Sequence, residues 1–600
     1  MKKAILYIVI VLMNLSFACA KESKLPRPEY PRPQLKRLEW INLNGQWTYT
    51  FDFGQSGMNR KLYNSQGFEN FITVPFCPES KLSGVGYTDF IPAMWYHRSI
   101  QIPDSWKGKQ VILHFGAIDY YSVIYIDGKV MKRHWGGSSS FDVNITTAIS
   151  DGKPHHLVVR VEDNCRSGMQ TRGKQSGNYY SQGCEYTRVT GIWQTVWMEP
   201  VNQFGIKSLQ ILPELDKKSF TILPQFYALS AGQQVEAVIK EDDKIVCRRI
   251  VNAATPLSIE LPLKKIRTWS PESPFLYNIE LYIRNKDGKI IDQVTSYAGM
   301  RKIHIEGNRL YLNNKPYYLR FVLDQGYYPD GIWTAPTDND LKRDIELSMA
   351  AGFNGARLHQ KVFEERYHYW ADRLGYLTWG ESASWGVNTS SPEAARNFLS
   401  EWSEIVERDR NHPSIICWTP FNETWDRPNN MEQAAQHDRL IADTYRLCHL
   451  LDNRPVNDAS GNYHVITDIW SVHHYAQNGP EMKKRLEPQN GIPTQKDVKM
   501  EVRYNGQPYF IDEYGGIKWV SGKQFSQNSW GYGKGPQTLE EFYARLKEIT
   551  DVILSYKHIS GYCYTQLTDV EQEQNGIYNY DRTPKFDMQR IKEIFSQKPY

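Results

Sequence analysis

Two glutamates with similar surroundings are the strongest chemical signal in the sequence. Glu423 follows the short apolar run Ser414–Trp418 and is preceded by Asn422, and Glu513 follows the apolar run Tyr509–Ile511. Each run has the composition of a strand that is buried on both faces. Both acids are therefore expected at the C-terminal ends of buried strands.

Aromatic residues flank the first of these acids. Trp418, Phe421 and Trp425 lie close to Glu423 in the sequence, and partial desolvation by such rings is expected to raise the pKa of a carboxyl group. A carboxylic acid of this kind can protonate a leaving oxygen, and a second, ionised carboxylate completes the equipment for glycoside hydrolysis. An isolated Asn-Glu pair is more often a helix cap or a salt-bridged glutamate than a catalytic acid. The presence of Glu513, a second acid at a strand end, makes that structural interpretation of Glu423 less favoured.

In the segment that carries both acids, short apolar runs alternate with amphipathic runs, which is the pattern of repeated βα units. Eight apolar runs are expected to be strands: Leu319–Leu323, Asn354–Leu358, Tyr376–Trp379, Ser414–Trp418, Pro455–Asp458, Ile469–Val472, Tyr509–Ile511 and Tyr562–Leu567. Five amphipathic runs are expected to be helices: Asp338–Met349, Val362–Leu374, Pro392–Arg408, Met431–Leu451 and Leu539–Tyr556. Eight strands predict a closed (β/α)₈ barrel, whose chemistry gathers at the C-terminal rim of the strands.

The region before the barrel alternates apolar and polar positions in short runs. Val111–Phe115 and His156–Val161 are examples from the first part, and Gln234–Ile239 and Tyr277–Ile283 from the second. Turn pairs such as Asp127-Gly128 separate the runs, which predicts antiparallel β-sandwiches.

These motifs resemble glycoside hydrolase family 2, the group of β-galactosidases, β-glucuronidases and β-mannosidases. The resemblance rests on Asn411–Ile415 with Asn422-Glu423, on Asp512–Gly515, and on the earlier landmarks Gly191–Val196 and Trp269–Tyr277. It implies a multidomain protein with a jelly-roll, sugar-binding-like domain over residues 35–200, an immunoglobulin-like β-sandwich over 201–302 and a catalytic TIM barrel over 303–600.

The resemblance also implies roles for individual residues. Glu423 would be the acid/base and Glu513 the nucleophile of a retaining exo-glycosidase, Asn422 would bind the 2-hydroxyl, Tyr475 would orient the nucleophile, and Arg357 would keep it ionised. The remaining predicted substrate-binding residues are Glu381, Glu185, His359, Trp470 and Tyr564. Three alternatives stay open: Tyr475 as a core tyrosine, Glu185 as a solvated surface residue, and Glu381 as the partner of a base.

Departures from the family pattern bear on the sugar. Many members carry Arg-x-Ser-His where this chain has Arg357–Gln360, and Thr565 stands where a tryptophan is usual. β-Glucuronidases grip the substrate carboxylate with Asn-x-Lys, but Glu573–Ile577 here reads Glu-Gln-Asn-Gly-Ile. An anion would be repelled there, so we expect terminal β-D-galactosides as substrates. The alternatives are α-L-arabinosides, then β-glucuronides, and, in a different class, a catalytically inactive carbohydrate-binding protein.

Composition excludes some other functions. A formal net charge of +4 on 600 residues gives no case for nucleic-acid binding. The seven cysteines after Cys19 form no Cys-x-x-Cys pair, and the adjacent His473 and His474 would point to opposite faces of a strand. We therefore expect no metal and no cofactor. A bridge between Cys165 and Cys184, and a homo-oligomer, both stay open, although buried free thiols are the favoured interpretation of the cysteines.

The N-terminus has the pattern of a secretory signal over residues 1–20, with Lys2-Lys3 before an apolar run. Leu15–Cys19 resembles an imperfect lipoprotein box, whereas Ala18-Cys-Ala20 fits ordinary cleavage. The polar, proline-rich tether over residues 21–34 favours a lipid anchor on Cys19. We expect an exported protein, periplasmic or attached to the outer membrane of a Gram-negative bacterium, with no later membrane-spanning run.

Overall fold

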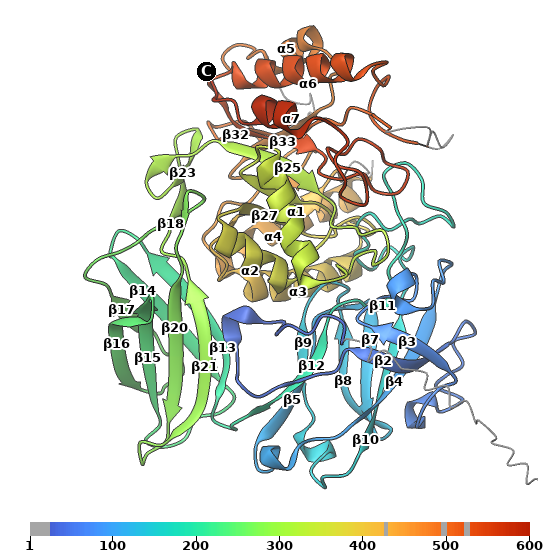
Figure 1. Cartoon of the computed structure of the whole chain (residues 1–600), viewed down its shortest axis with the longest axis vertical. Coiled ribbons are helices and arrows are strands. Elements are labelled where there is room, and N and C mark those ends of the chain that lie inside the picture. The colour runs from blue at the N-terminus through green and yellow to red at the C-terminus, as the bar shows by residue number, and fades with distance from the viewer. Residues whose placement is uncertain (1–24, 425–429, 494–500, 521–528) are drawn as a thin grey trace, which may run out of the picture.

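The computed structural model describes residues 25–424, 430–493, 501–520 and 529–600. The predicted signal segment, Cys19 and Trp425 lie outside these ranges. Two β-sandwich domains lie side by side and the barrel sits against both of them (Figure 1). No helix in the described ranges is long and apolar enough to cross a membrane. The seven cysteines of the described residues are free thiols, Cys165 and Cys184 included.

The first sandwich is antiparallel and has two main sheets. The larger has the order β3 (Asn70–Val74), β2 (Gly45–Phe51), β4 (Ala93–Ile100), β10 (His155–Glu162), β7 (Tyr121–Ile126) and β8 (Lys129–Trp135). The smaller has the order β1 (Ile41–Asn42), β12 (Val196–Val201), β5 (Gln110–Phe115) and β9 (Phe141–Asn144), and β6 (Ile118–Asp119) pairs with β11 (Gly191–Ile192). Alternate residues such as Leu157, Val159 and Val161 fill the core between the sheets, because successive strand residues face opposite sides.

The second sandwich is smaller and also antiparallel. One sheet contains β13 (Ile206–Glu214), β14 (Ser219–Phe226) and β17 (Ile259–Pro262), and the other β16 (Lys244–Asn252), β15 (Gln234–Glu241), β20 (Tyr277–Arg284) and β21 (Ile290–Ala298). A short hairpin of β18 (Trp269–Ser270) and β19 (Ser273–Pro274) precedes β20. A small three-stranded sheet of β22 (Ile303–Glu306), β23 (Arg309–Leu312) and β24 (Lys315–Pro316) leads on to the barrel.

Seven parallel strands form the main sheet of the barrel. Their order is β28 (Ile415–Thr419), β27 (Leu377–Glu381), β26 (Gly355–Leu358), β25 (Leu319–Asp324), β33 (Ile559–Thr565), β32 (Tyr509–Gly515) and β31 (Trp470–His474). The predicted strand at Pro455–Asp458 is reduced to a parallel bridge between Val456 and Trp418. The chain then forms β30 (Ala459–Ser460), which pairs in parallel with β29 (Phe421–Asn422). The eighth position of the barrel is therefore filled by two short pieces.

Helices cover the outside of this barrel (Figure 1). They are α1 (Asp338–Ala350), α2 (Glu365–Leu374), α3 (Pro392–Asp409), α4 (Met431–Leu451), α5 (Gly479–Leu486), α6 (Leu539–Leu554) and α7 (Met588–Phe595). The five predicted helices are present with small shifts at their ends, while α5 and α7 were not predicted. Several begin with a side-chain cap, as at Thr337, Ser391 and Thr538, which satisfies a free backbone N–H group of the first turn.

Candidate active site

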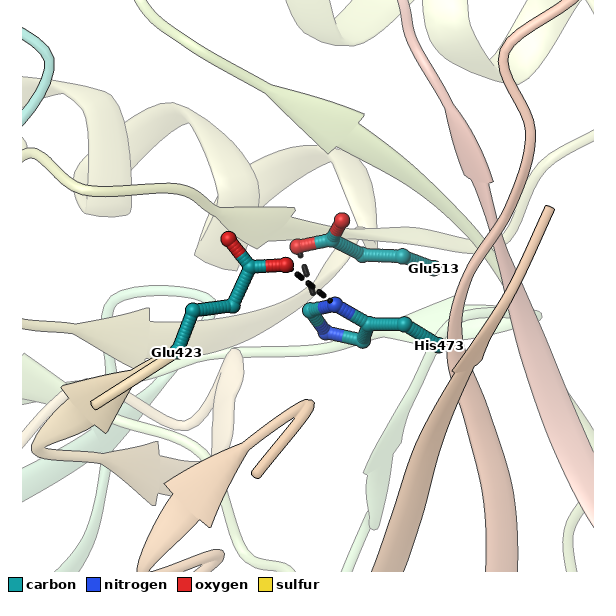
Figure 2. A group of neighbouring side chains, drawn as sticks. All are labelled: Glu423, His473 and Glu513. Carbon is teal, nitrogen blue, oxygen red and sulfur yellow. Dashed lines mark hydrogen bonds and ion pairs between the residues drawn. The ribbon is translucent and has the colours of Figure 1, made fainter. Parts of the chain in front are cut away.

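The two strand-end glutamates meet at the C-terminal rim of the barrel. Glu513 lies within β32, and Glu423 directly follows β29. Glu423 has a φ of 48°, a left-handed conformation that is uncommon for a residue with a side chain and is often found at functional sites. One oxygen of each carboxyl group lies within 4.8 Å of the other. Figure 2 shows the two carboxyl groups next to each other with the ring of His473 beside both.

Two hydrogen-bond donors and one ion-pair partner converge on the Glu513 carboxylate. Arg357 Nη1 donates to Oε1 at 3.0 Å, and the Tyr475 hydroxyl donates to Oε2. His473 Nε2 lies 3.3 Å from Oε1. Burial and the Glu513 charge raise the pKa of the Tyr475 phenol well above its usual value, so that phenol remains a donor. Two cationic groups and a phenol stabilise a charged carboxylate, which is the state that a nucleophile requires.

Glu423 contacts His473 directly, and this overturns one expectation. His473 Nδ1 lies 2.9 Å from Glu423 Oε1. Burial alone would raise the pKa of Glu423, but the hydrogen bond and charge of His473, together with Lys174, lower it to about 2. The predicted raised pKa is therefore wrong for the free site. Trp418 and Phe421 cannot supply it, because both belong to the hydrophobic cluster beneath α3 and α4.

The proton that Glu423 lacks is held on the neighbouring imidazole. Burial lowers the pKa of His473, but the Glu513 and Asp512 carboxylates and the hydrogen bond with Glu423 raise it above its ordinary value of 6.5. Ser460 Oγ lies 2.9 Å from His473 Nε2 and donates to Asp512 Oδ2 at 2.5 Å. Gly461, with a φ of +64°, leaves room for the ring, because a Cβ there would lie 2.2 Å from it. Glu423 and His473 therefore share one proton as a coupled pair.

Arg357 connects the acids to Asn422. Its Nη2 donates to Asn422 Oδ1 at 2.6 Å and its Nε donates to Glu381 Oε2 at 2.6 Å. Since an arginine can only donate, the Asn422 atom that faces Arg357 must be the oxygen, and Asn422 Nδ2 points away from Arg357. Asn422 Nδ2 is buried without a hydrogen-bond partner among the described residues. It is therefore free to donate to a sugar hydroxyl.

Comparison with known proteins agrees with this geometry. Family models match over three adjacent stretches, described as the sugar binding domain of glycosyl hydrolases family 2 over residues 41–199, glycosyl hydrolases family 2 over 205–301, and its TIM barrel domain over 303–598. The chain belongs to glycoside hydrolase family 2. Glu423 and Glu513 are therefore the candidate catalytic pair of a glycosyl hydrolase.

Individual family members are only distantly similar. A β-galactosidase of Thermoanaerobacter pseudethanolicus is 24% identical over 64% of this chain, a match that spans about half (52%) of that protein's length. A β-glucuronidase of Paenibacillus borealis is 22% identical over 70% of this chain and 72% of its own. The structure of a β-glucuronidase from Ruminococcus gnavus superposes with a TM-score of 0.77, at 20% identity, over 95% of this chain and all of that one. The last likeness concerns the fold alone.

Two predicted substrate-binding residues of this family 2 chain are misplaced. Trp470 and Tyr564 are fully buried (0% exposed) in the cluster between the barrel sheet and its helices, so they cannot contact a sugar. Strand alternation explains the error. In β31 the ring of His473 faces the site, whereas Trp470 and Val472 face outward. In β33 the Thr565 hydroxyl lies 3.1 Å from the Tyr475 hydroxyl, whereas Tyr564 faces outward.

Three other predicted residues lie in or beside the site. Glu381 is fully occupied by Arg357 Nε and the Gln360 backbone N–H, so the alternative of a carboxylate paired with a base describes it better than a sugar ligand. His359 is buried 3.0 Å from Glu381, and burial, with the charges of Lys174 and Arg357, lowers its pKa well below the usual value. It is therefore a neutral ring, and its contact with substrate stays a prediction.

Glu185 reaches the barrel, although mainly through its backbone. Its carbonyl accepts from Gln572 Nε2 at 2.9 Å, and its carboxylate accepts from Arg172 Nη2 at 2.7 Å. The surface interpretation is thus too simple, because the side chain is held in an ion pair within its own segment of the jelly-roll domain. Whether it touches the sugar stays a prediction.

Sequence reasoning missed several residues of the site. His473 was considered only as half of a metal pair, and its partner does face away, since His474 Nε2 lies near the Tyr509 hydroxyl at 3.4 Å. Glu423, His473 and Glu513 lie close enough to share a metal ion, but the short ring–carboxylate contacts are explained by the imidazole itself. The other missed residues are Lys174, Trp385, Tyr532 and, as a buried site residue, Glu573. Only Tyr532 had a possible signal in the sequence, which is the glycine at position 516. Gly516 leaves room for the Tyr532 ring to stack on Tyr475, with 3.4 Å between ring centroids.

Proposed function

We propose that the protein is a retaining exo-glycosidase that hydrolyses terminal non-reducing β-D-galactosides by double displacement. The observation that carries the retaining assignment is the approach of Glu423 and Glu513 oxygens to within 4.8 Å. Retaining enzymes place their carboxyl groups about 5–5.5 Å apart, whereas inverting enzymes need roughly 6.5–9.5 Å to admit a water molecule. An oxygen-to-oxygen distance below 4.8 Å lies on the retaining side of this division, which supports the proposal.

The reaction follows from the contacts. Glu513, oriented by Arg357 and Tyr475, attacks the anomeric carbon, while the proton of the Glu423–His473 pair passes through Glu423 to the departing glycosidic oxygen. Glu423 then removes a proton from water, and that water displaces Glu513 from the anomeric carbon. Asn422 Nδ2, which is oriented by Arg357, would donate to the neighbouring 2-hydroxyl, a bond that strengthens in the transition state.

The choice of a neutral sugar rests on the charges around the site. Glu573 is buried (2% exposed) and accepts from Asn575 Nδ2 at 3.0 Å and from the Tyr186 hydroxyl. Its carboxyl group stands at the sequence position where glucuronidases of this family carry a grip for an anion. A carboxyl group at this position disfavours a second carboxylate on the substrate, whereas Glu423, Glu513 and Asp512 are balanced by Arg357 and His473.

A β-glucuronidase is the second candidate. One argument for it is the buried ammonium group of Lys174, whose charge, like that of His473, lowers the pKa of Glu423. The other is the activity named for several relatives. A single cation among several carboxylates is weaker support than the acidic residue at position 573.

Initial rates on aryl glycosides over a range of pH test the proposal. The panel contains the β-galactoside, the α-L-arabinopyranoside, the α-L-arabinofuranoside, the β-glucuronide and the β-mannoside. We expect the largest kcat/KM for the β-galactoside, with the arabinopyranoside next because it shares the ring configuration. A higher kcat/KM for the glucuronide would refute the neutral-sugar assignment and leave the retaining mechanism standing.

A further inference from the structure

A segment of the jelly-roll domain inserts a buried lysine beside the catalytic carboxylates. Residues 163–190 rise from that domain along the barrel (Figure 1). The Arg172 and Gly173 backbone N–H groups donate to the carbonyls of Trp385 and Ala383 at 2.8 and 3.1 Å. Gly173 has a φ of +55°, and a Cβ there would lie 2.1 Å from the Gln360 carbonyl oxygen. Only glycine permits this approach, so Lys174 is delivered to the barrel by a tightly docked loop.

The ammonium group of Lys174 is nearly enclosed, and the described residues give it no hydrogen-bond partner. The residue is 6% exposed, and its Nζ lies 3.9 Å from the centroid of the Trp385 ring. No described residue forms a hydrogen bond with Nζ or a carboxylate contact within 4.0 Å of it. A cation–π contact alone compensates an ammonium group only partly for the loss of water, so a further polar partner would stabilise it.

Carboxylates nevertheless surround this group at longer range. Burial lowers the pKa of Lys174, but Cys184, Glu573, Glu423 and Glu513 together raise it, so the side chain is charged. Its charge in turn acts on His359 and Glu423. The Trp385 ring that contacts Nζ also donates through its Nε1 to the Asn422 carbonyl at 3.1 Å, so Lys174 lies beside the segment that carries Glu423.

Glu573 provides a carboxyl group from the barrel; burial raises its pKa above the usual value, against the charge of Lys174 and the hydrogen bonds from Tyr186 and Asn575. Its two oxygens accept from Tyr186 and Asn575, which fixes the carboxyl group. Tyr186 belongs to the same jelly-roll segment as Lys174, and the Tyr186 backbone N–H donates to the Lys174 carbonyl at 2.7 Å. The position of the lysine and that of the acid are thus set by one interdomain contact.

We propose that Lys174 and Glu573 form a two-domain clamp for sugar hydroxyl groups remote from the scissile bond, and that Lys174 determines specificity. The inference rests on the proposed function and deepens it. A hydroxyl group can accept from the ammonium and donate to the carboxylate at once, which satisfies both partners. A substrate carboxylate would satisfy Lys174 but would face Glu573 without a proton to donate. The clamp therefore suits the 4- and 6-hydroxyls of a neutral hexose.

The test combines variants with deoxygenated substrates. Lys174→Met and Glu573→Gln keep side-chain size, and Lys153→Met, a substitution of an exposed lysine in the same domain, is the matched control. With an aryl β-D-galactoside we expect kcat/KM to fall about 10- to 100-fold for both site variants, which is the range of hydrogen bonds to charged groups, and to stay within threefold for the control. Melting temperatures within a few degrees of wild type would show that each variant is folded.

Substrates lacking one hydroxyl separate a clamp from general damage. The wild-type enzyme should hydrolyse the 4-deoxygalactoside or the 6-deoxygalactoside 10- to 100-fold more slowly than the parent, and Lys174→Met should lose no further activity on that same analogue. Equal losses by Lys174→Met on the parent and on both analogues would overturn the clamp, as would wild-type rates that are alike on all three substrates. The second arm needs no variant and so does not depend on folding.

Failure of the clamp and failure of the proposed function give different results. If wild-type enzyme prefers the β-glucuronide, the proposed sugar is wrong. A loss of glucuronide activity in Lys174→Met with a gain in Glu573→Gln would then assign Lys174 to a substrate carboxylate and overturn the hydroxyl clamp. If wild-type enzyme prefers the galactoside while Lys174→Met retains full kcat/KM, the clamp alone is wrong.

Discussion

The hydroxyl of Tyr475 offers the sharpest test of how the nucleophile is held. Tyr475→Phe removes an uncharged donor to Glu513 and leaves the ring contacts intact, because the ring stacks on Tyr532 with 3.4 Å between centroids and an angle of 6°. Glu513 Oε1 still has Arg357 and His473, but Oε2 loses the only hydrogen bond that the described residues give it.

The size of the effect follows from the charge of the acceptor. A hydrogen bond to a charged group contributes about 1.5–3 kcal/mol, and each 1.36 kcal/mol of transition-state stabilisation is tenfold in rate. We therefore expect kcat/KM to fall about 10- to 150-fold on an aryl β-galactoside, with an unchanged melting temperature.

A neighbouring tyrosine supplies the matched control. Tyr514 is adjacent to Glu513 but faces the outer side of β32, where its hydroxyl lies 3.0 Å from Thr550 Oγ1. Tyr514→Phe should change kcat/KM less than threefold. If Tyr475→Phe also stays within threefold of wild type, the assignment of Glu513 as a nucleophile oriented by this phenol is refuted.

Three further predictions concern the acid/base. Glu423→Gln should lower kcat/KM about 10²- to 10⁴-fold on substrates with poor leaving groups and far less on a dinitrophenyl glycoside, which needs no protonation; equal losses on both would argue against an acid role. In the wild-type enzyme the raised pKa of His473 keeps the shared proton on the pair above pH 6.5, so activity should be lost as pH rises through that raised value. In His473→Gln only Glu423 can hold the proton, so the basic limb of the pH–rate profile should move to lower pH. A basic limb that does not move would contradict the coupled pair. Gly461→Ala places a Cβ 2.2 Å from the His473 ring at a φ of +64° and should cost at least about 1–2 kcal/mol of stability, seen as a lower melting temperature; wild-type melting would show that the ring is not confined there.

Periodicity was sufficient to predict the barrel. The long amphipathic runs that became α1, α3, α4 and α6 carry a strong local signal, since tertiary packing and pattern agree there. The two short helices α5 and α7, with eight residues each, present too few turns for a clear pattern. The fifth strand is also weak, because Pro455 and the bend after Val456 leave only a bridge to Trp418.

The site was predictable where function depends on strand ends and unpredictable where it depends on distant segments. Glu423 and Glu513 follow from their place after apolar runs. The lowered pKa of Glu423 could not follow, because its cause, His473, lies on another strand. Lys174 comes from another domain altogether. Trp470 and Tyr564 are a different case, since the alternation of strand residues could have shown that they face the helices.

The stereochemistry of the product tests the central claim most directly. Proton NMR of the anomeric signals, recorded during the first minutes of hydrolysis of an aryl β-galactoside, distinguishes the sugar released from the sugar formed later by mutarotation. Because Glu423 and Glu513 lie within 4.8 Å, the account predicts that the β anomer appears first and the α anomer only later. Initial release of the α anomer would show direct attack by water and would contradict the double-displacement mechanism.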